Sequence, residues 1–180
     1  MIMEEAKYDL RGHELILRNA TEDEAQNLID YLKITAVETP FLIKELEEIT
    51  LTLEQEREFI RMNNESEHSE LIMGFLDGEY IGNCSIMGNS RMRYAHRATV
   101  GIALYLKYTN MGIGTIMFEK MIEIGRKKGL EQLELEVVAS NQAGISLYQK
   151  MGFERFGTFS NNMKYKDGTY VDCYWMMKKL

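Results

Sequence analysis

Two hydrophobic periodicities run along the chain, and the two-residue period predicts strands. From Leu133 to Val137, apolar residues alternate with Glu134 and Glu136, as on a strand with one buried face. Residues 69–88 form two strand-like runs around Asp77-Gly78, a strong hairpin signal. Residues 98–106 are so apolar that neither face of this strand is expected to meet water. Three further strands are expected at 13–20, 153–160 and 170–180.

The helical period predicts the remaining elements. Thr21 with Glu24, and Thr52 with Gln55, have the spacing of capping boxes and predict two helix starts. A third helix follows Gly112 and ends near Gly129, and a short one is expected over 142–152. Apolar residues recur at helical spacing in the first of these helices (Leu28, Ile29, Leu32) and in the third (Ile113, Ile116, Met117, Met121, Ile124).

These elements predict a mixed α/β fold. The hairpins are antiparallel, whereas the strand-helix-strand unit across 104–138 should be parallel. No repeat or linker divides the chain, so a single domain over 1–180 is expected.

Charge and composition narrow the function. The chain has 28 Asp and Glu against 21 Lys and Arg, a net charge of -7, which argues against a sequence-independent nucleic-acid binder. Cys84 and Cys173 belong to no C-x-x-C pair, which predicts buried free thiols in a reducing compartment. The acidic start lacks a long apolar run, so we expect no signal peptide or membrane span and a cytoplasmic location. The three histidines have no metal-ligand spacing, and no metal is predicted.

The turn that contains Gly112 and Gly114 is a candidate anion site. A glycine-rich turn between a strand and a helix offers unpaired amides and the positive end of the helix dipole. A P-loop would require Lys and then Ser or Thr where the chain has Thr115-Ile116, and a dinucleotide fingerprint would require Gly or Ala at Met117. Close packing of the helix on the strand is the alternative explanation of both glycines.

Three segments together resemble the GNAT superfamily of acyl-CoA-dependent N-acetyltransferases, in particular the branch with ribosomal-protein, polyamine and amino-acid acetyltransferases. They are AHRATVGIAL, YLKYTNMGIGTIMFEKMIEIGRKKGL and LELEVVASNQAGISLYQKMGF, within residues 95–153. The resemblance implies a central, mostly antiparallel mixed sheet of about seven strands flanked by helices, and acetyl-CoA as acyl donor. It implies that the pyrophosphate lies on the turn Thr109, Asn110, Met111, Gly112, Ile113, Gly114 and Thr115. It further implies that pantetheine pairs with the backbone at Leu104, Tyr105 and Leu106. Thr109 stands where the family usually has Gln or Arg, and Leu106 where proline is common.

The same resemblance assigns candidate chemistry. Tyr148 occupies the position that protonates the departing CoA sulfur in similar enzymes, and Asn141 the position of an asparagine that contacts the cofactor. An N-cap role for Asn141 is equally compatible. Lys127 or Lys128, in the basic GRKKG segment, are candidates to touch the 3'-phosphate.

The sequence does not identify a single general base. Relatives often carry a glutamate where this chain has Thr99, and the strand has no acid of its own. Possible substitutes are Glu134, Glu136, Asp172 and His96. An α-amine with a pKa near 7.7 is unprotonated more than about a tenth of the time at pH 7, so ordered water could suffice as the base for such a substrate.

These observations predict an enzyme that transfers an acetyl group to a primary amine of a small molecule or a protein N-terminus. Direct attack in a ternary complex is expected, because neither cysteine lies near the motifs in sequence. A CoA-binding regulatory module without turnover is the alternative. Acceptor specificity is expected to depend on the region 30–64 and the final hairpin, and the aromatic residues of the last strand could form a homodimer contact.

Overall fold

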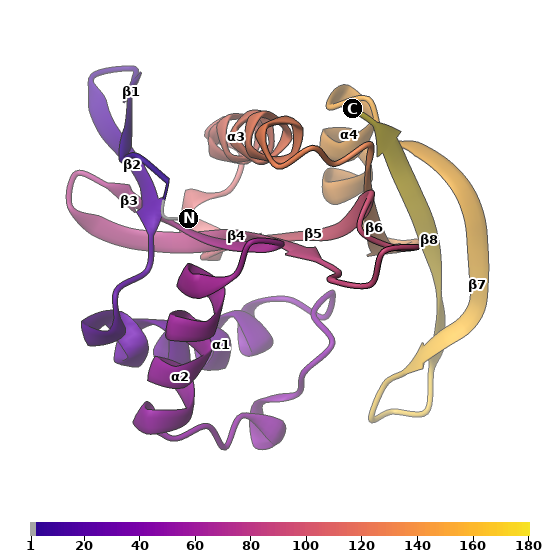
Figure 1. The fold of residues 1–180 in the computed structure, drawn as a ribbon. Helices are drawn as coiled ribbons and strands as arrows, with labels where there is room; N and C mark the ends of the chain where they lie inside the picture. Colours follow the sequence, from indigo (N-terminus) through magenta and orange to yellow (C-terminus); the bar gives the residue numbers. More distant parts are fainter. Residues whose placement is uncertain (1–2) are drawn as a thin grey trace.

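A computed structural model describes residues 3–180 as helices on both sides of an eight-stranded sheet (Figure 1). The strand order is β1-β2-β3-β4-β5-β6-β8-β7. The strands are β1 (Ala6–Leu10), β2 (His13–Asn19), β3 (Ser69–Leu76), β4 (Glu79–Gly88), β5 (Arg97–Leu104), β6 (Gln132–Val138), β7 (Glu154–Lys164) and β8 (Tyr170–Lys179). The helices are α1 (Ala25–Glu38), α2 (Leu53–Glu65), α3 (Ile113–Lys127) and α4 (Gln142–Lys150). The predicted mixed fold is confirmed.

The sheet topology follows the predicted pairing, with one strand more than the sequence indicated. Every neighbouring pair is antiparallel except β5 and β6, which are parallel and connected through α3. The additional strand is β1, which pairs with β2 through a turn at Arg11 and Gly12 with φ angles of 57° and 90°. Arg-Gly is a weaker turn signal than Asp-Gly, and β1 has no fully buried residue to reveal a period.

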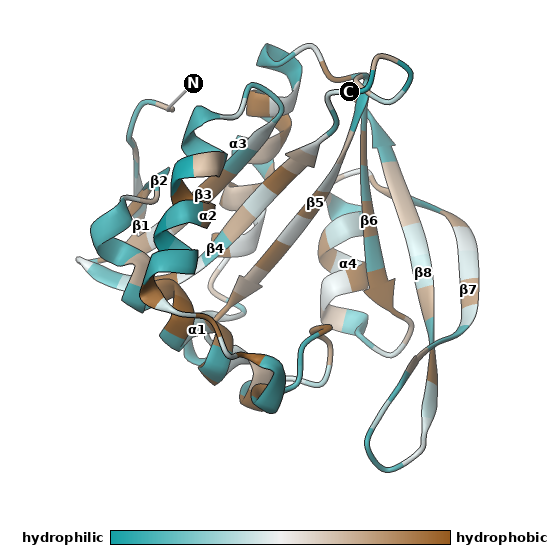
Figure 2. Cartoon of the chain, turned by 60° about the horizontal axis from the view of Figure 1, so that its bottom comes forward, coloured by the Kyte–Doolittle hydropathy of each residue, from teal (hydrophilic) through white to brown (hydrophobic). Residues whose placement is uncertain are grey.

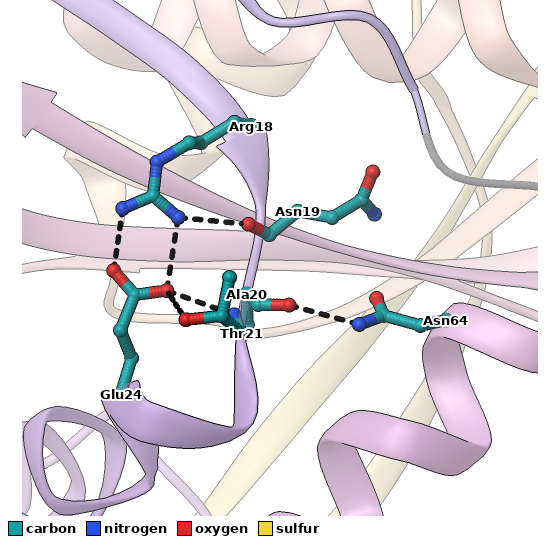
Figure 3. Close-up of polar contacts among 6 residues, drawn as sticks. All are labelled: Arg18, Asn19, Ala20, Thr21, Glu24 and Asn64. Atoms are coloured by element: carbon teal, nitrogen blue, oxygen red, sulfur yellow. Dashed lines mark hydrogen bonds and ion pairs between the residues drawn. The ribbon is translucent and has the colours of Figure 1, made fainter.

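Both predicted capping boxes are present, and the first one fixes the entrance to α1. Glu24 Oε2 accepts from the Thr21 amide at 2.8 Å, and the Arg18 guanidinium forms two hydrogen bonds with the same carboxylate (Figure 3). Asn64 at the end of α2 donates to the Ala20 carbonyl at 2.9 Å. These contacts hold the start of α1 and the end of α2 against the end of β2.

The two faces of the sheet are covered unequally. Helices α3 and α4 lie over one face and bury most of the core, including Phe118, Leu133 and Met176. Helices α1 and α2 lie over the other face next to β3, where Leu28, Ile60 and Met73 form a second cluster. In the described part of the chain, neither helix extends over β6, β8 and β7 (Figures 1 and 2). We call this uncovered surface, on the α1 side of β6, β8 and β7, the open face.

Two adjacent strands separate in the middle of the sheet. Only three residue pairs join β5 to β6, ending at Thr99 and Glu134. Beyond that point β5 continues to Leu104 and β6 to Val138 without pairing, and the two strands diverge (Figure 2). We call this gap in the ladder the β5–β6 opening. The loss of pairing leaves backbone groups of both strands available in the centre of the protein.

A buried ion pair connects this scaffold to the C-terminal end of α3. Lys128 Nζ lies 3.0 Å from Glu70 Oε2, and the two side chains are 13% and 4% exposed. Asn19 donates to the other carboxylate oxygen at 2.6 Å. The two lysines that the sequence offered for a cofactor phosphate are both in ion pairs here: Lys128 pairs with Glu70 and Lys127 with Glu123. Both lie about 20 Å along the helix from the glycine turn, given a rise of about 1.5 Å per residue.

Candidate active site

The glycine turn presents a row of free backbone donors. The chain leaves β5 through a short 3-10 turn, Leu106–Tyr108, and enters α3 at Ile113. Asn110 and Gly112 have left-handed backbones, with φ of 61° and 89°. Alternation of this kind aims successive amides toward one side. The amides of residues 110–114 have no acceptor among residues 3–180, so the start of α3 has the form of an anion site.

The two glycines of this turn are required for different reasons. A Cβ on Gly112 would meet nothing within 4 Å, so its left-handed backbone is what requires glycine. A Cβ on Gly114 would lie 2.9 Å from Leu147 Cδ2 of α4. Packing therefore requires glycine at position 114, but the close partner is Leu147 of α4 and not the strand expected from the sequence, whose Ile102 Cδ1 lies 3.9 Å away.

Threonine at position 109 makes only a local contact. Its hydroxyl donates to the Leu106 carbonyl at 2.7 Å and closes the 3-10 turn. Thr115 lies one turn further on, where its hydroxyl accepts from Lys150 Nζ at 3.2 Å. Lys150 is thus the cation that the structure brings to the glycine turn, and no sequence motif indicated it.

Leu104 points free backbone groups into the β5–β6 opening. The Tyr105 amide donates to the Ile81 carbonyl at 3.0 Å, so the odd-numbered residues of β5 bond to β4. Consecutive residues point to opposite edges, and the Leu104 amide therefore faces the opening. The Leu106 amide donates to Glu38 Oε2 at 2.8 Å. Of the three expected pantetheine partners, only Leu104 keeps its amide free, and Glu38 is a contact that the sequence did not reveal.

Tyr148 belongs to α4, the helix that lies behind the β5–β6 opening in Figure 2, and its side chain is half-buried with an unused hydroxyl. Its ring packs against Phe118 and Phe153, with centroids 5.3 and 6.4 Å away. The hydroxyl makes no hydrogen bond within residues 3–180, and because it is not a fully buried unsatisfied atom it can be reached from outside the core. Burial raises the pKa of Tyr148 to about 12, because the phenolate would lose its hydration. The group is therefore a protonated donor at any physiological pH, with its hydrogen available to a ligand.

Asn141 acts as a helix cap in this structure. Its side-chain oxygen accepts from the Gly144 amide at 2.9 Å at the start of α4. This bond satisfies one of the unpaired amides of the helix and sets the direction of α4, and hence the position of Tyr148.

Among the candidate bases, Glu136 lies at the opening. Its carboxylate is exposed on the open face of β6, at the level where β5 has already separated. Trp175 Nε1 donates to one oxygen at 2.9 Å and Asn162 Nδ2 to the other at 2.6 Å, which fixes its orientation. Neither Trp175 nor Asn162 was a sequence candidate, since nothing in the chain signals that β7 and β8 bring them to β6.

The other candidates are occupied or remote. Glu134 is paired with Arg97 at 2.7 Å, at the last rung of the ladder. Asp172 accepts from the Asn161 amide at 2.8 Å. His96 precedes β5, about 26 Å along the strand from Leu104 at about 3.3 Å per residue. Thr99 is an exposed hydroxyl on β5 and has no acid–base capacity at neutral pH.

Both cysteines are buried free thiols, as predicted. Cys173 is nevertheless closer to the site than its sequence position suggested, because it pairs with Val138 on β6. Burial raises the pKa of its thiol, and the nearby Glu136 adds to that effect. The thiolate that a nucleophile requires is therefore disfavoured.

The two regions expected to bind the acceptor face each other across a cleft of about 1040 Å³. One wall comes from residues 36–48 after α1, and the other from the β7–β8 hairpin at 163–167. Tyr165 donates to the Pro40 carbonyl at 2.9 Å, and Lys166 lies 2.6 Å from Glu47.

Within residues 3–180, no group of His, Cys, Asp and Glu side chains is arranged to hold a metal ion. No helix in the same range is both long and apolar enough to cross a membrane.

Comparison with known sequences identifies the family. Residues 35–153 match the sequence profile of the Acetyltransferase (GNAT) family. The chain belongs to the GNAT family. The resemblance inferred from the glycine turn and the Asn141–Tyr148 segment is thereby confirmed.

Individual GNAT relatives agree with this assignment. The chain is 31% identical to L-amino acid N-acetyltransferase AaaT of Escherichia coli over 108 residues, 59% of this chain and 66% of AaaT. It spans 45 to 51% of the length of five further curated N-acetyltransferases.

Solved GNAT structures have the same fold. An acetyltransferase of the GNAT family from Streptococcus pneumoniae superposes with a TM-score of 0.88 and 30% identity, covering 92% of this chain and 99% of that one. The acetyltransferase yncA of Salmonella typhimurium, solved with its cofactor acetyl-CoA, superposes with a TM-score of 0.80 at 15% identity and covers 92% and 94%. The second likeness concerns the fold alone.

Proposed function

We propose that this protein transfers an acetyl group from acetyl-CoA to a primary amine of a small molecule or a protein N-terminus. The observation that carries the proposal is the unpartnered hydroxyl of Tyr148 beside the β5–β6 opening, next to a turn of free amides. A bound acetyl-CoA would supply the acyl group as a reactive thioester. Free donors, an open strand edge and a half-buried proton donor are the three features that such a ligand requires.

The free amides of residues 110–114 would hold the diphosphate, with Lys150, which donates to Thr115, as a cation beside the turn. The Leu104 amide would donate into the opening and orient the pantetheine arm there. The amide contacts use backbone groups that nothing else in the described chain satisfies, so these contacts do not require existing bonds to break.

Two side chains would move the protons. Glu136 would accept the proton of the attacking amine, and Tyr148 would donate its hydrogen to the departing sulfur. The amine attacks the thioester directly in this proposal, because the raised pKa of the Cys173 thiol disfavours the thiolate that an acylated cysteine would require. A base matters most for a lysine-like amine, which is unprotonated only about 0.04% of the time at pH 7.

The test is release of free CoA from acetyl-CoA with a panel of amines and N-terminal peptides. We expect Tyr148→Phe and Glu136→Gln each to lower kcat by roughly 10²-fold or more. Tyr94→Phe, at an exposed ring outside the site, is the control and should leave kcat unchanged. Tight binding of acetyl-CoA without transfer to any amine would support the regulatory alternative and refute the proposal.

A further inference from the structure

Three aromatic rings form an exposed cluster on the open face. Trp175 of β8 lies between Phe156 and Phe159 of β7, with ring centroids 6.0 and 5.9 Å away. The three side chains, which we call the aromatic cluster, are 39%, 53% and 47% exposed. Exposed aromatic groups of this size are uncommon on a protein surface without a binding role.

The aromatic cluster directly contacts Glu136, the proposed base, through Trp175. Trp175 lies directly opposite Glu136 in the β6–β8 ladder and opposite Gly157 in the β7–β8 ladder. Its indole nitrogen donates to Glu136 Oε2 at 2.9 Å, which fixes the ring with its polar edge on the carboxylate. Neighbouring strands are about 4.8 Å apart, so the cluster begins about one strand spacing from Glu136 and extends over about two. That is the reach of one large side chain beyond an amine held at Glu136.

The cluster also continues toward the cleft. Along β8, the next pairs on the same face as Trp175 are Cys173 opposite Phe159, and then Val171 opposite Met163. Met163 lines the cleft of about 1040 Å³ between residues 36–48 and the hairpin. This space is larger than one amino acid needs and suits several residues of an extended chain.

Charge complementarity selects the kind of acceptor. A free amino acid carries a carboxylate within about 4 Å of its amine, where Glu136 would repel it. Arg97 is engaged by Glu134 and Lys166 by Glu47, whereas Lys44 and Lys164 line the cleft without an ion pair in the described part of the chain. Lys164 lies opposite Tyr170, about 17 Å along β8 from Trp175 at about 3.4 Å per residue, beyond the reach of the carboxylate of an amino acid held at Glu136. In a peptide the same position is a neutral amide, so the repulsion disappears.

We infer that the acceptor is a polypeptide N-terminus whose first residue has a large apolar or aromatic side chain. This side chain packs on Phe156, Trp175 and Phe159, the α-amine meets Glu136, and the following residues run into the cleft. The inference rests on the proposed function and specifies its substrate.

The experiment compares kcat/KM for peptides of one length that begin with Phe, Leu or Gly, and for free phenylalanine. We expect the Phe and Leu peptides to exceed the Gly peptide by about tenfold or more, with free phenylalanine below them. Phe156→Ala and Phe159→Ala should each reduce the ratio of kcat/KM for the Phe peptide to that for the Gly peptide about threefold or more. Tyr170→Ala, on an exposed ring of the same hairpin outside the cluster, is the matched control.

Three results would overturn the inference while the proposed function stands. They are equal rates for all first residues, a preference for free phenylalanine, and a preference that both variants retain. A fourth overturning result would come from analytical ultracentrifugation of the parent and the variants. If the parent is a dimer and Phe159→Ala dissociates it, the aromatic cluster is a subunit interface. Failure to release CoA with any amine would instead refute the proposed function.

Discussion

The buried pair of Glu70 and Lys128 gives the sharpest test of how this fold is held together. Replacement of Lys128 by methionine keeps the bulk of the side chain but leaves the Glu70 carboxylate, 4% exposed, without its cation. Asn19 would remain as its side-chain donor. Breaking a buried pair from one side costs about 3–5 kcal/mol, because an uncompensated charge stays in the interior. For a chain of 180 residues this corresponds to a Tm lower by roughly 6–20 °C, at about 2–4 °C per kcal/mol.

The assay is urea unfolding of parent, Lys128→Met, Glu70→Gln and the double variant, with Tm from thermal scans. We expect the double variant to recover most of the loss, because it removes both charges together, so that the cycle shows a coupling energy of about 2 kcal/mol or more. Lys127→Met is the matched control one residue away, since its exposed pair with Glu123 is screened by solvent. Equal effects of the two lysine substitutions would refute the reasoning, as would a much weaker acetyl-CoA affinity in Lys128→Met at unchanged stability.

Three further predictions concern the turn, the proton donor and the first helix. Gly112→Ala should lower the free energy of unfolding in urea by about 1–2 kcal/mol, because alanine is strained in the left-handed backbone although its Cβ meets nothing. The stability loss of Gly114→Ala should be smaller in a Leu147→Ala background, which removes the clashing side chain. An unchanged loss there would contradict the packing argument. Burial raises the pKa of Tyr148 to about 12, so the phenol should stay protonated and kcat should not fall between pH 8 and 10.5 through its ionisation. A fall in that range that is present in the parent and absent in Tyr148→Phe would contradict this. Burial acts to raise the pKa of Glu24, but hydrogen bonds outweigh it and leave the pKa below its ordinary value. Stability from this group is therefore present above the ordinary pKa of about 4.5 and lost as the pH falls through the lowered one, so that Glu24→Gln should flatten acid unfolding below pH 4.5.

Local signals in the sequence predicted most of the fold. Asp77-Gly78, the two capping boxes and the alternation at Leu133–Val137 each describe a few consecutive residues, and each appears in the structure as expected. The strand β1 escaped because its turn and its half-exposed residues give no such local signal.

The site was less predictable than the fold, because it depends on contacts between distant segments. The turn at Gly112 and the position of Tyr148 followed from motifs, although their roles stay predictions. Glu38 on the Leu106 amide and Trp175 on Glu136 join residues 68 and 39 positions apart. No period or motif records such distances. The single domain over 1–180 also stays a prediction.

The short ladder between β5 and β6 has a consequence for the protein without ligand. Three residue pairs are all that join one half of the sheet to the other directly, so the amides beyond Thr99 should exchange with deuterium sooner than those of β3 and β4. A pantetheine arm bound along Leu104 would pair with β5 in place of the missing part of β6 and would connect the two halves of the sheet. Saturation at 100 times the Kd would add about 2.7 kcal/mol of stability, so that the abundance of acetyl-CoA in the cell would determine how rigid this molecule is.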